Sequence, residues 1–143
     1  KDININCAIS DKKTSKKMYF VDNLSPLNTL DQNHLKFLKK NFLFKNKDFK
    51  EKKIKTENIN NILKKHNINK VDFLNIDKER KEYEIIRSIN YKKFKIKLIC
   101  VEILDHNKLS KDKSKKIHQI LKKNNFKYLK KIGVNSIFKN IYF

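Results

Sequence analysis

Two short apolar runs, separated by a helix-like segment, dominate the pattern of hydrophobic and polar positions. Residues 71–77 and 96–104 have the length and the β-branched content of buried strands. Between them, Tyr83, Ile86 and Ile89 recur at helical spacing. A strand, a helix and a strand over roughly 35 residues predict a βαβ unit, with parallel strands and a right-handed crossover.

Further elements are predicted on both sides of this unit. Alternating or short apolar runs predict strands, and apolar residues three and four apart predict helices. The expected strands are residues 3–9, 17–21, 49–56, 126–132 and 136–143, and residues 31–48 are expected to be partly helical. A helix capped by Thr56 is expected to turn Ile59, Ile62 and Leu63 inward. A second helix is expected from Leu109, with Ile117, Ile120 and Leu121 inward. Residues 133–135 hold the only glycine and predict a tight turn. The pattern predicts an α/β sheet, mostly parallel, with a C-terminal antiparallel hairpin.

Acidic residues stand where the two central strands are expected to end. Asp77 and Glu79 follow the first strand, and Glu102 lies near the end of the second. In open α/β sheets the ligand crevice lies at the carboxyl ends of the strands, which makes these acids candidates for a functional site. The alternative is a solvated turn that caps the next helix, because carboxylates are stabilised near a helix N-terminus. The spacing alone leaves both interpretations open.

The length and net charge of the chain raise a second possible function, the binding of nucleic acid. A chain of 143 residues with 38% hydrophobic residues is long enough for a single domain with one sizeable core. The net charge of +21 is compatible with a lysine-rich nucleic-acid-binding module. However, only Arg80 and Arg87 are arginine, the residue suited to phosphate and base contacts. Lys, Asn and Ile have A/T-rich codons, so we favour codon bias over selected binding of nucleic acid.

Several classes of protein are not expected. No apolar run approaches the ~20 residues of a membrane span, and residues 1–10 lack the apolar core of a signal peptide. We therefore expect a cytoplasmic protein. Cys7 and Cys100 fit no metal spacing and no CxxC motif, which favours buried reduced thiols. The four histidines are scattered, so no metal site is predicted.

The residues around the central strands carry a resemblance. Val71 to Glu79, then Tyr83 to Ile86, then Lys97 to Ile103 resemble the FkbM-type methyltransferases. The motif of that family runs as an apolar strand, Ile-Asp-x-Glu-Gly, a short helix and a second strand that ends in Val-Glu. Residues 132–137 resemble its closing hairpin, and the match extends from Ile3 to Tyr142. The resemblance implies a Rossmann-like class I fold and S-adenosylmethionine as the cofactor.

The resemblance also implies roles for the strand-end acids. Asp77 and Glu79 are implied as catalytic residues: Asp77 would orient the acceptor or contact the amino end of the cofactor, and Glu79 would be the base. The sequence does not separate these roles. Glu102 is implied as a supporting or substrate-side partner.

Two other segments match the family in order. The cofactor contacts are implied near the adenine, at Ala8, Ile9, Ser10 and Asp11. Asn28 and Thr29 are similar to the Asn-Thr loop of the family and are implied at the acceptor side. A plain turn is the alternative for both segments.

The sequence departs from the family pattern at its glycines. Arg80 replaces the glycine of the motif, and a single glycine, Gly133, cannot form the glycine-rich cofactor loop. The ribose-binding acid is also missing. We therefore expect residues 1–143 to be the C-terminal part of a methyltransferase domain that binds the cofactor poorly on its own. The complete protein is expected to be an O- or N-methyltransferase of a small molecule, saccharide or glycan, with O-methylation favoured. The alternative is a non-catalytic, degenerate relative.

Overall fold

A computed structural model describes residues 2–22, 25, 27–41, 49–77, 81–104 and 108–143, with only the backbone of Leu109. The chain divides into two compact units. The first comprises Lys1–Ala8 and Lys12–Thr56, and the second comprises Ile9–Asp11 and Glu57–Phe143.

The first unit is built on an antiparallel strand pair. β2 (Thr14–Phe20) pairs with β3 (Lys50–Asn58), in a register that runs from Thr14 opposite Thr56 to Phe20 opposite Lys50. α1 (Gln32–Asn41) lies within the segment predicted to be partly helical. It begins where the Asp31 carboxylate accepts a hydrogen bond from the Asn33 backbone N–H at 2.8 Å. The small core of this unit consists of Tyr19, Leu35, Leu38 and Phe49.

The first predicted strand is much shorter in the structure. β1 covers only Ala8–Ser10, and the three-stranded sheet has the order β1-β3-β2. The side chains of Ile3 and Ile5 are 62% and 44% exposed, so the prediction of a strand at 3–9 is wrong for its first half. An alternating sequence permits a strand but forms one only where a neighbouring strand pairs with it.

The start of α2 (Ile59–Lys65) corrects another prediction. Its N-cap is Asn58, whose side chain accepts a hydrogen bond from the Asn60 backbone N–H at 2.8 Å. Thr56, the predicted cap, still belongs to β3, and its hydroxyl donates to the Lys12 carbonyl at 3.0 Å. The strand continues two residues further than expected, so the cap moves with it. Ile59 and Leu63 are buried as predicted.

The second unit contains the βαβ pattern read from the sequence. Its four-stranded sheet has the order β4-β5-β7-β6, and the strands are β4 (Lys70–Ile76), β5 (Lys95–Glu102), β6 (Phe126–Ile132) and β7 (Asn135–Asn140). β4 and β5 are parallel, from Lys70 opposite Lys95 to Ile76 opposite Val101. β7 is antiparallel to both β5 and β6. The parallel β4–β5 pair and the C-terminal hairpin are thus confirmed. The prediction of a mostly parallel sheet is wrong, because β7 pairs antiparallel with β5 as well as with β6, so the sheet is mixed.

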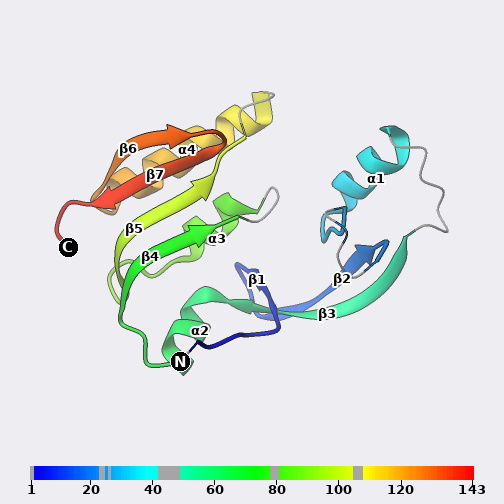
Figure 1. The fold of residues 1–143 in the computed structure, drawn as a ribbon, viewed down its shortest axis with the longest axis horizontal. Helices are drawn as coiled ribbons and strands as arrows, with labels where there is room; N and C mark the ends of the chain where they lie inside the picture. The colour runs from blue at the N-terminus through cyan, green and yellow to red at the C-terminus, as the bar shows by residue number, and fades with distance from the viewer. Residues whose placement is uncertain (1, 23–24, 26, 42–48, 78–80, 105–107) are drawn as a thin grey trace. The chain divides into compact units, whose positions relative to one another are not determined.

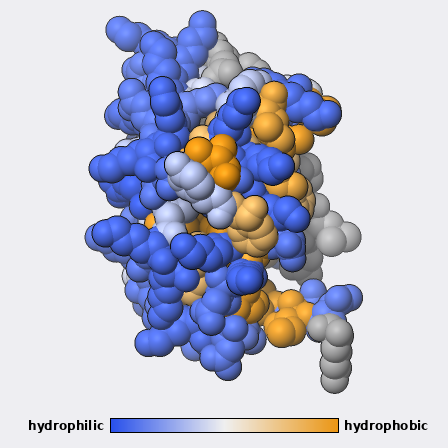
Figure 2. All heavy atoms as spheres, turned by 90° about the vertical axis from the view of Figure 1, so that its left-hand side faces the viewer, coloured by the Kyte–Doolittle hydropathy of each residue, from blue (hydrophilic) through white to orange (hydrophobic). Residues whose placement is uncertain are grey.

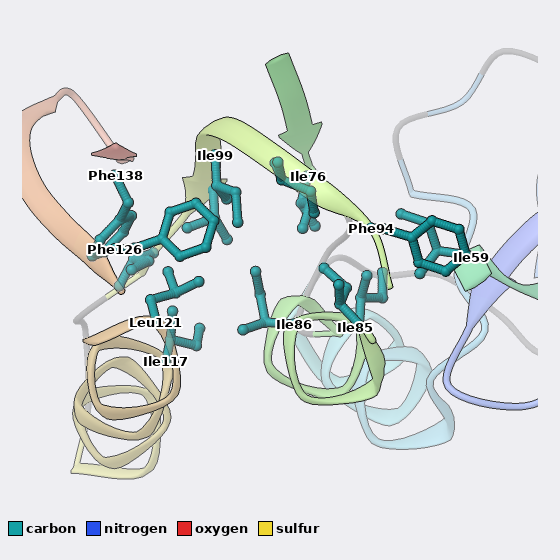
Figure 3. Packing of buried hydrophobic residues seen from close by; sticks show 14 of the residues in the cluster. Ile59, Ile76, Ile85, Ile86, Phe94, Ile99, Ile117, Leu121, Phe126 and Phe138 are labelled. Atoms are coloured by element: carbon teal, nitrogen blue, oxygen red, sulfur yellow. The ribbon is translucent and has the colours of Figure 1, made fainter. Parts of the chain in front are cut away.

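Two helices cover one face of this sheet. α3 (Glu82–Ser88) and α4 (Lys108–Lys123) lie on the same side of it (Figure 1). In Figure 3 the side chains that point from these helices toward the strands are Ile85, Ile86, Ile117 and Leu121, and they meet Ile76, Ile99 and Phe138. All seven are at most 5% exposed. Within the described residues, no helix is long and apolar enough to cross a membrane.

The hairpin turn between β6 and β7 depends on Gly133. This residue has φ = +58°, in the left-handed region that glycine enters at little cost. A Cβ added there would meet no heavy atom within 4 Å, so only backbone strain would oppose a side chain. Asn67 and Asn125 show that this chain also uses asparagine at positive φ.

We expect Gly133→Ala to destabilise the second unit by about 1 kcal/mol, because alanine is strained in the left-handed region. Gly133→Asn should cost clearly less, because asparagine tolerates that region. Urea denaturation followed by circular dichroism measures both variants. Equal losses for alanine and asparagine would show that strain at this φ is not what Gly133 relieves.

Candidate functional site

The carboxyl ends of β4 and β5 bring two of the predicted acids to one edge of the sheet. Ile76 pairs with Val101 in the parallel register, and Asp77 and Glu102 directly follow these two residues. Asp77 is exposed, whereas Glu102 is partly buried. Glu79, the other acid predicted to be catalytic, lies outside the described residues. The catalytic roles of Asp77 and Glu79 stay predictions.

A cysteine beside this edge is held in its thiol form. Cys100 pairs with Asn75 across the parallel strands and is a partly buried free cysteine. Burial raises the pKa of its thiol, and the negative charge of Asp77 raises it further. The thiol is therefore a poor nucleophile at neutral pH. Cys7 is also free, and both cysteines are less buried than the sequence suggested.

Glu82 is the buried carboxylate that the sequence analysis missed. It is the first residue of α3 and only 8% exposed, and its Oε1 has no hydrogen-bond partner among the described residues. The pKa of Glu82 is raised to about 7, first by burial and then by the negative charges of Glu102 and Glu84. Lys113 and the Glu82 backbone N–H act in the opposite direction. Glu82 therefore exchanges its proton near neutral pH.

Glu84 connects this group to α4. The Nζ of Lys113 lies 3.9 Å from Oε1 of Glu84, and the two side chains are 34% and 26% exposed. Oε2 of Glu84 is buried and has no hydrogen-bond partner among the described residues. Glu84 and Glu102 both act on Glu82, so three carboxylates influence one another here in a chain that is strongly basic.

Helical periodicity contains the signal that would have found Glu82. Ile85, Ile86 and Ile89 form the buried face of α3 and the turn after it. Glu82 precedes Ile85 by three residues and Ile86 by four, which places it on the same face of the helix. An acid on the apolar stripe of a helix is the position to single out.

We expect Glu82→Gln to stabilise the second unit more at pH 8 than at pH 5. The carboxyl takes up its proton at about pH 7 in the folded chain, above its ordinary value of 4.5. Between these values the folded state binds more protons than the unfolded state, so stability falls as pH rises through this window. Glutamine removes that loss. Urea denaturation at both pH values measures the difference.

Glu51→Gln is the matched control for this change. Glu51 is exposed and pairs with Lys17 at 2.8 Å, a surface interaction of small energy. Its effect on stability should stay nearly constant between pH 5 and pH 8. A Glu82→Gln difference that is equally constant would contradict the raised pKa.

The segment implied near the adenine is held in place by local hydrogen bonds. Ser10 is buried, and its hydroxyl donates to the Asp11 carboxylate at 3.0 Å. The Asn58 side-chain amide donates to the Asp11 carbonyl at 2.7 Å. Ile9 packs against the core of the second unit, while Ala8 belongs to the first. These contacts show a packed turn, and a cofactor role for Ala8 to Asp11 stays a prediction.

Asn28 and Thr29 belong to the first unit, whereas Asp77 and Glu102 belong to the second. The Val21 backbone N–H donates to the Asn28 side-chain oxygen at 3.0 Å, and the Asn28 amide donates to the Asp22 carbonyl at 2.7 Å. Thr29 forms an isolated bridge with Tyr19. These bonds brace a loop, and its role at the acceptor side stays a prediction.

Comparison with known protein families identifies the family of the chain. The profile of the methyltransferase FkbM domain family matches residues 1–128, which is most of the chain. The matched range contains β4, α3 and β5 with the acids at their ends. No curated protein and no solved structure matches the chain.

Proposed function

The chain belongs to the methyltransferase FkbM domain family, and we propose that it serves the transfer of a methyl group from S-adenosylmethionine to a hydroxyl group of a small molecule, saccharide or glycan. The observation that carries this proposal is the acidic edge at the carboxyl ends of β4 and β5, where Asp77 and Glu102 follow paired residues. Ligands of open α/β sheets bind at such an edge.

The acids of this edge have the charge that the reaction needs. When bound, S-adenosylmethionine supplies an electrophilic methyl group, and its sulfonium and amino groups are positively charged. Carboxylates attract positive charge and accept hydrogen bonds from hydroxyl or ammonium groups. Asp77, which is exposed, is therefore proposed to orient the acceptor or to hold the amino end of the cofactor. Positioning of this kind supplies much of the rate of an in-line displacement.

We propose that residues 1–143 form the C-terminal part of a Rossmann-like methyltransferase domain. The only glycine of the chain, Gly133, lies in the β6–β7 turn, so no glycine-rich cofactor loop is present. β4 is an edge strand of the sheet, and its Phe73 is 56% exposed. Parallel strands are usually covered on both sides. Both observations fit a sheet that continues beyond β4 in the complete protein.

Calorimetry tests whether residues 1–143 bind S-adenosylmethionine on their own or form only part of a cofactor-binding domain. Residues 1–143 should give no saturable heat with S-adenosylmethionine, because the loop that approaches the cofactor is not present, whereas the complete protein should bind it. Micromolar affinity of residues 1–143 would overturn the proposal of a partial domain.

Activity is tested with the complete protein and methyl-labelled S-adenosylmethionine. A panel of hydroxylated small molecules, free saccharides and glycans serves as acceptors, and matched amines serve as controls. We expect label in a methyl ether on one hydroxyl class. Label on amines alone would contradict O-methylation, and a complete protein that binds no cofactor would favour a degenerate relative.

The competing function is that of a lysine-rich nucleic-acid-binding module. Its support is the charge of +21 and the exposed lysines of β6, Lys127, Lys130 and Lys131. The face shown in Figure 2 is mostly hydrophilic, with a few hydrophobic side chains between. Attraction by scattered lysines falls steeply with salt, so titration against single- and double-stranded nucleic acid decides. Submicromolar binding at ~0.15 M salt would favour this alternative.

A further inference from the structure

The charged groups that act electrostatically on Glu82 come from three structural elements. Glu102 comes from the end of β5, Glu84 from α3 itself, and Lys113 from α4. Because β4 and β5 are parallel, Glu102 and the start of α3 lie at the same carboxyl edge as Asp77. The edge where the proposed reaction takes place thus has the exposed Asp77 at a strand end and the buried Glu82 at the start of α3.

The buried, unpaired oxygen of Glu82 is the observation that points to a ligand. Buried polar atoms are almost always hydrogen-bonded, and an unpaired one costs free energy. Oε1 of Glu82 has no such partner among the described residues, although the side chain is 92% buried. In the described part of the chain, no group of three or more His, Cys, Asp or Glu side chains could hold a metal ion. A hydrogen-bond donor from a bound molecule, such as a hydroxyl group, is the partner that fits.

Resting on the proposed function, we propose that Glu82 is the proton acceptor for the substrate hydroxyl and that Glu102 is a positioning residue whose negative charge acts on Glu82. Asp77 then keeps only the orienting role. The general base is placed on α3, and not at the strand end where the sequence suggested Glu79.

The proton balance of the step is simple. The substrate O–H bond breaks and its proton passes to Oε1 of Glu82, while the oxygen forms a bond to the methyl carbon. The carbon–sulfur bond breaks, and its electron pair stays on sulfur, which becomes neutral. Glu82 leaves the step as a neutral carboxylic acid and loses its proton to solvent before the next turnover.

The electrostatics of the cluster suit this role. A general base works best when its pKa lies near the working pH, and burial with Glu102 and Glu84 raises the pKa of Glu82 to about 7. A negative charge near a carboxyl group disfavours its ionised form, which is how Glu102 acts on Glu82. Lys113 limits the rise. Removing the charge of Glu102 should therefore lower the pKa of Glu82.

The titration itself is measured without any activity. Residues 1–143 labelled with ¹³C at the glutamate carboxyl carbons are followed by NMR from pH 3 to pH 9, with Glu82→Gln used for assignment. One carboxyl should titrate near pH 7 and disappear in Glu82→Gln. In Glu102→Gln its midpoint should move to lower pH. A Glu82 midpoint that stays unchanged in Glu102→Gln would overturn the role of the Glu102 charge.

The catalytic part is measured as the pH profile of methyl transfer by the complete protein. The wild type should lose activity below about pH 7, Glu82→Gln should lose about 10²–10⁴-fold at every pH, and Glu102→Gln should keep activity to lower pH. Thermal melting checks folding, and the shift in Glu102→Gln carries the test if Glu82→Gln does not fold. If the wild type is active but its loss of activity at low pH occurs at the same pH in Glu102→Gln, this inference is overturned and the proposed function stands. A wild type that transfers no methyl group at any pH overturns the proposed function and this inference with it.

Discussion

Replacing Phe94 with alanine is expected to remove about 3–5 kcal/mol from the stability of the second unit. The Phe94 side chain is 1% exposed and belongs to the core formed by the sheet, α3 and α4. It stands directly before β5, where its backbone N–H donates to the Asn90 carbonyl at 3.0 Å. Alanine leaves a cavity between elements that are fixed on several sides, so the surroundings cannot close on it. The free energy of unfolding of a small domain is only about 5–15 kcal/mol, so this loss removes a large fraction of it.

Phe73→Ala is the matched control. Phe73 is the same residue type in β4 of the same sheet, but it is 56% exposed. In residues 1–143 its replacement should cost less than about 1 kcal/mol, as surface substitutions do. Urea denaturation and amide NMR spectra of both variants give the comparison. Equal losses for the two phenylalanines would contradict the position of the core.

The second large effect is expected at Asp77. Asp77→Asn keeps the size of the side chain and removes its charge, and because Asp77 is exposed, the fold should hold. A lost positioning or charge interaction at the reaction centre costs on the order of 2–4 kcal/mol, which is ~10²–10³ in rate. Methyl transfer by the complete protein, followed with labelled cofactor, measures the loss, and melting confirms the fold.

Asp72→Asn is the control for this substitution. Asp72 is also exposed and lies in the same strand, near its amino end and therefore away from the proposed crevice. Its replacement should leave turnover nearly unchanged. Near-normal turnover in Asp77→Asn, or equal damage by Asp72→Asn, would mean that the reaction centre is not at this strand end.

The elements that the sequence predicted well are those whose pattern is local. The βαβ unit was found because Val71 to Asp77 and Ile96 to Leu104 are short apolar runs that flank a helical period. Which strands pair with one another is harder to read from the sequence. Residues 3–9 alternate as a strand should, but only Ala8–Ser10 forms one, because partner strands are not encoded in the alternation itself. Likewise, the cap of α2 moved from Thr56 to Asn58 because β3 extends further than its apolar pattern.

The part of the candidate site that was predicted from the sequence is the part that follows from a local pattern. Asp77 and Glu102 could be placed at one edge because the ends of parallel strands can be read from the sequence. Glu82 was missed because an acid in the first turn of a helix is normally a solvated one. Its spacing from Ile85 and Ile86 places it on the apolar face of α3, but does not reveal its raised pKa. Its burial and its coupling to Glu102 and Lys113 arise only when α3 packs against β5 and α4. Tertiary packing, and not local sequence, creates the unusual carboxylate.

The central claim is that the carboxyl edge of β4 and β5 is where the cofactor and acceptor bind, and hydrogen–deuterium exchange tests it most directly. The complete protein is compared with and without S-adenosylhomocysteine, the product of methyl transfer, and the exchange of each peptide is followed by mass spectrometry. Protection is expected in the peptides that contain Asp77 and Glu102, while the hairpin of residues 126–140 should be unchanged. Protection of the hairpin with no change at the Asp77 and Glu102 peptides would contradict the claim.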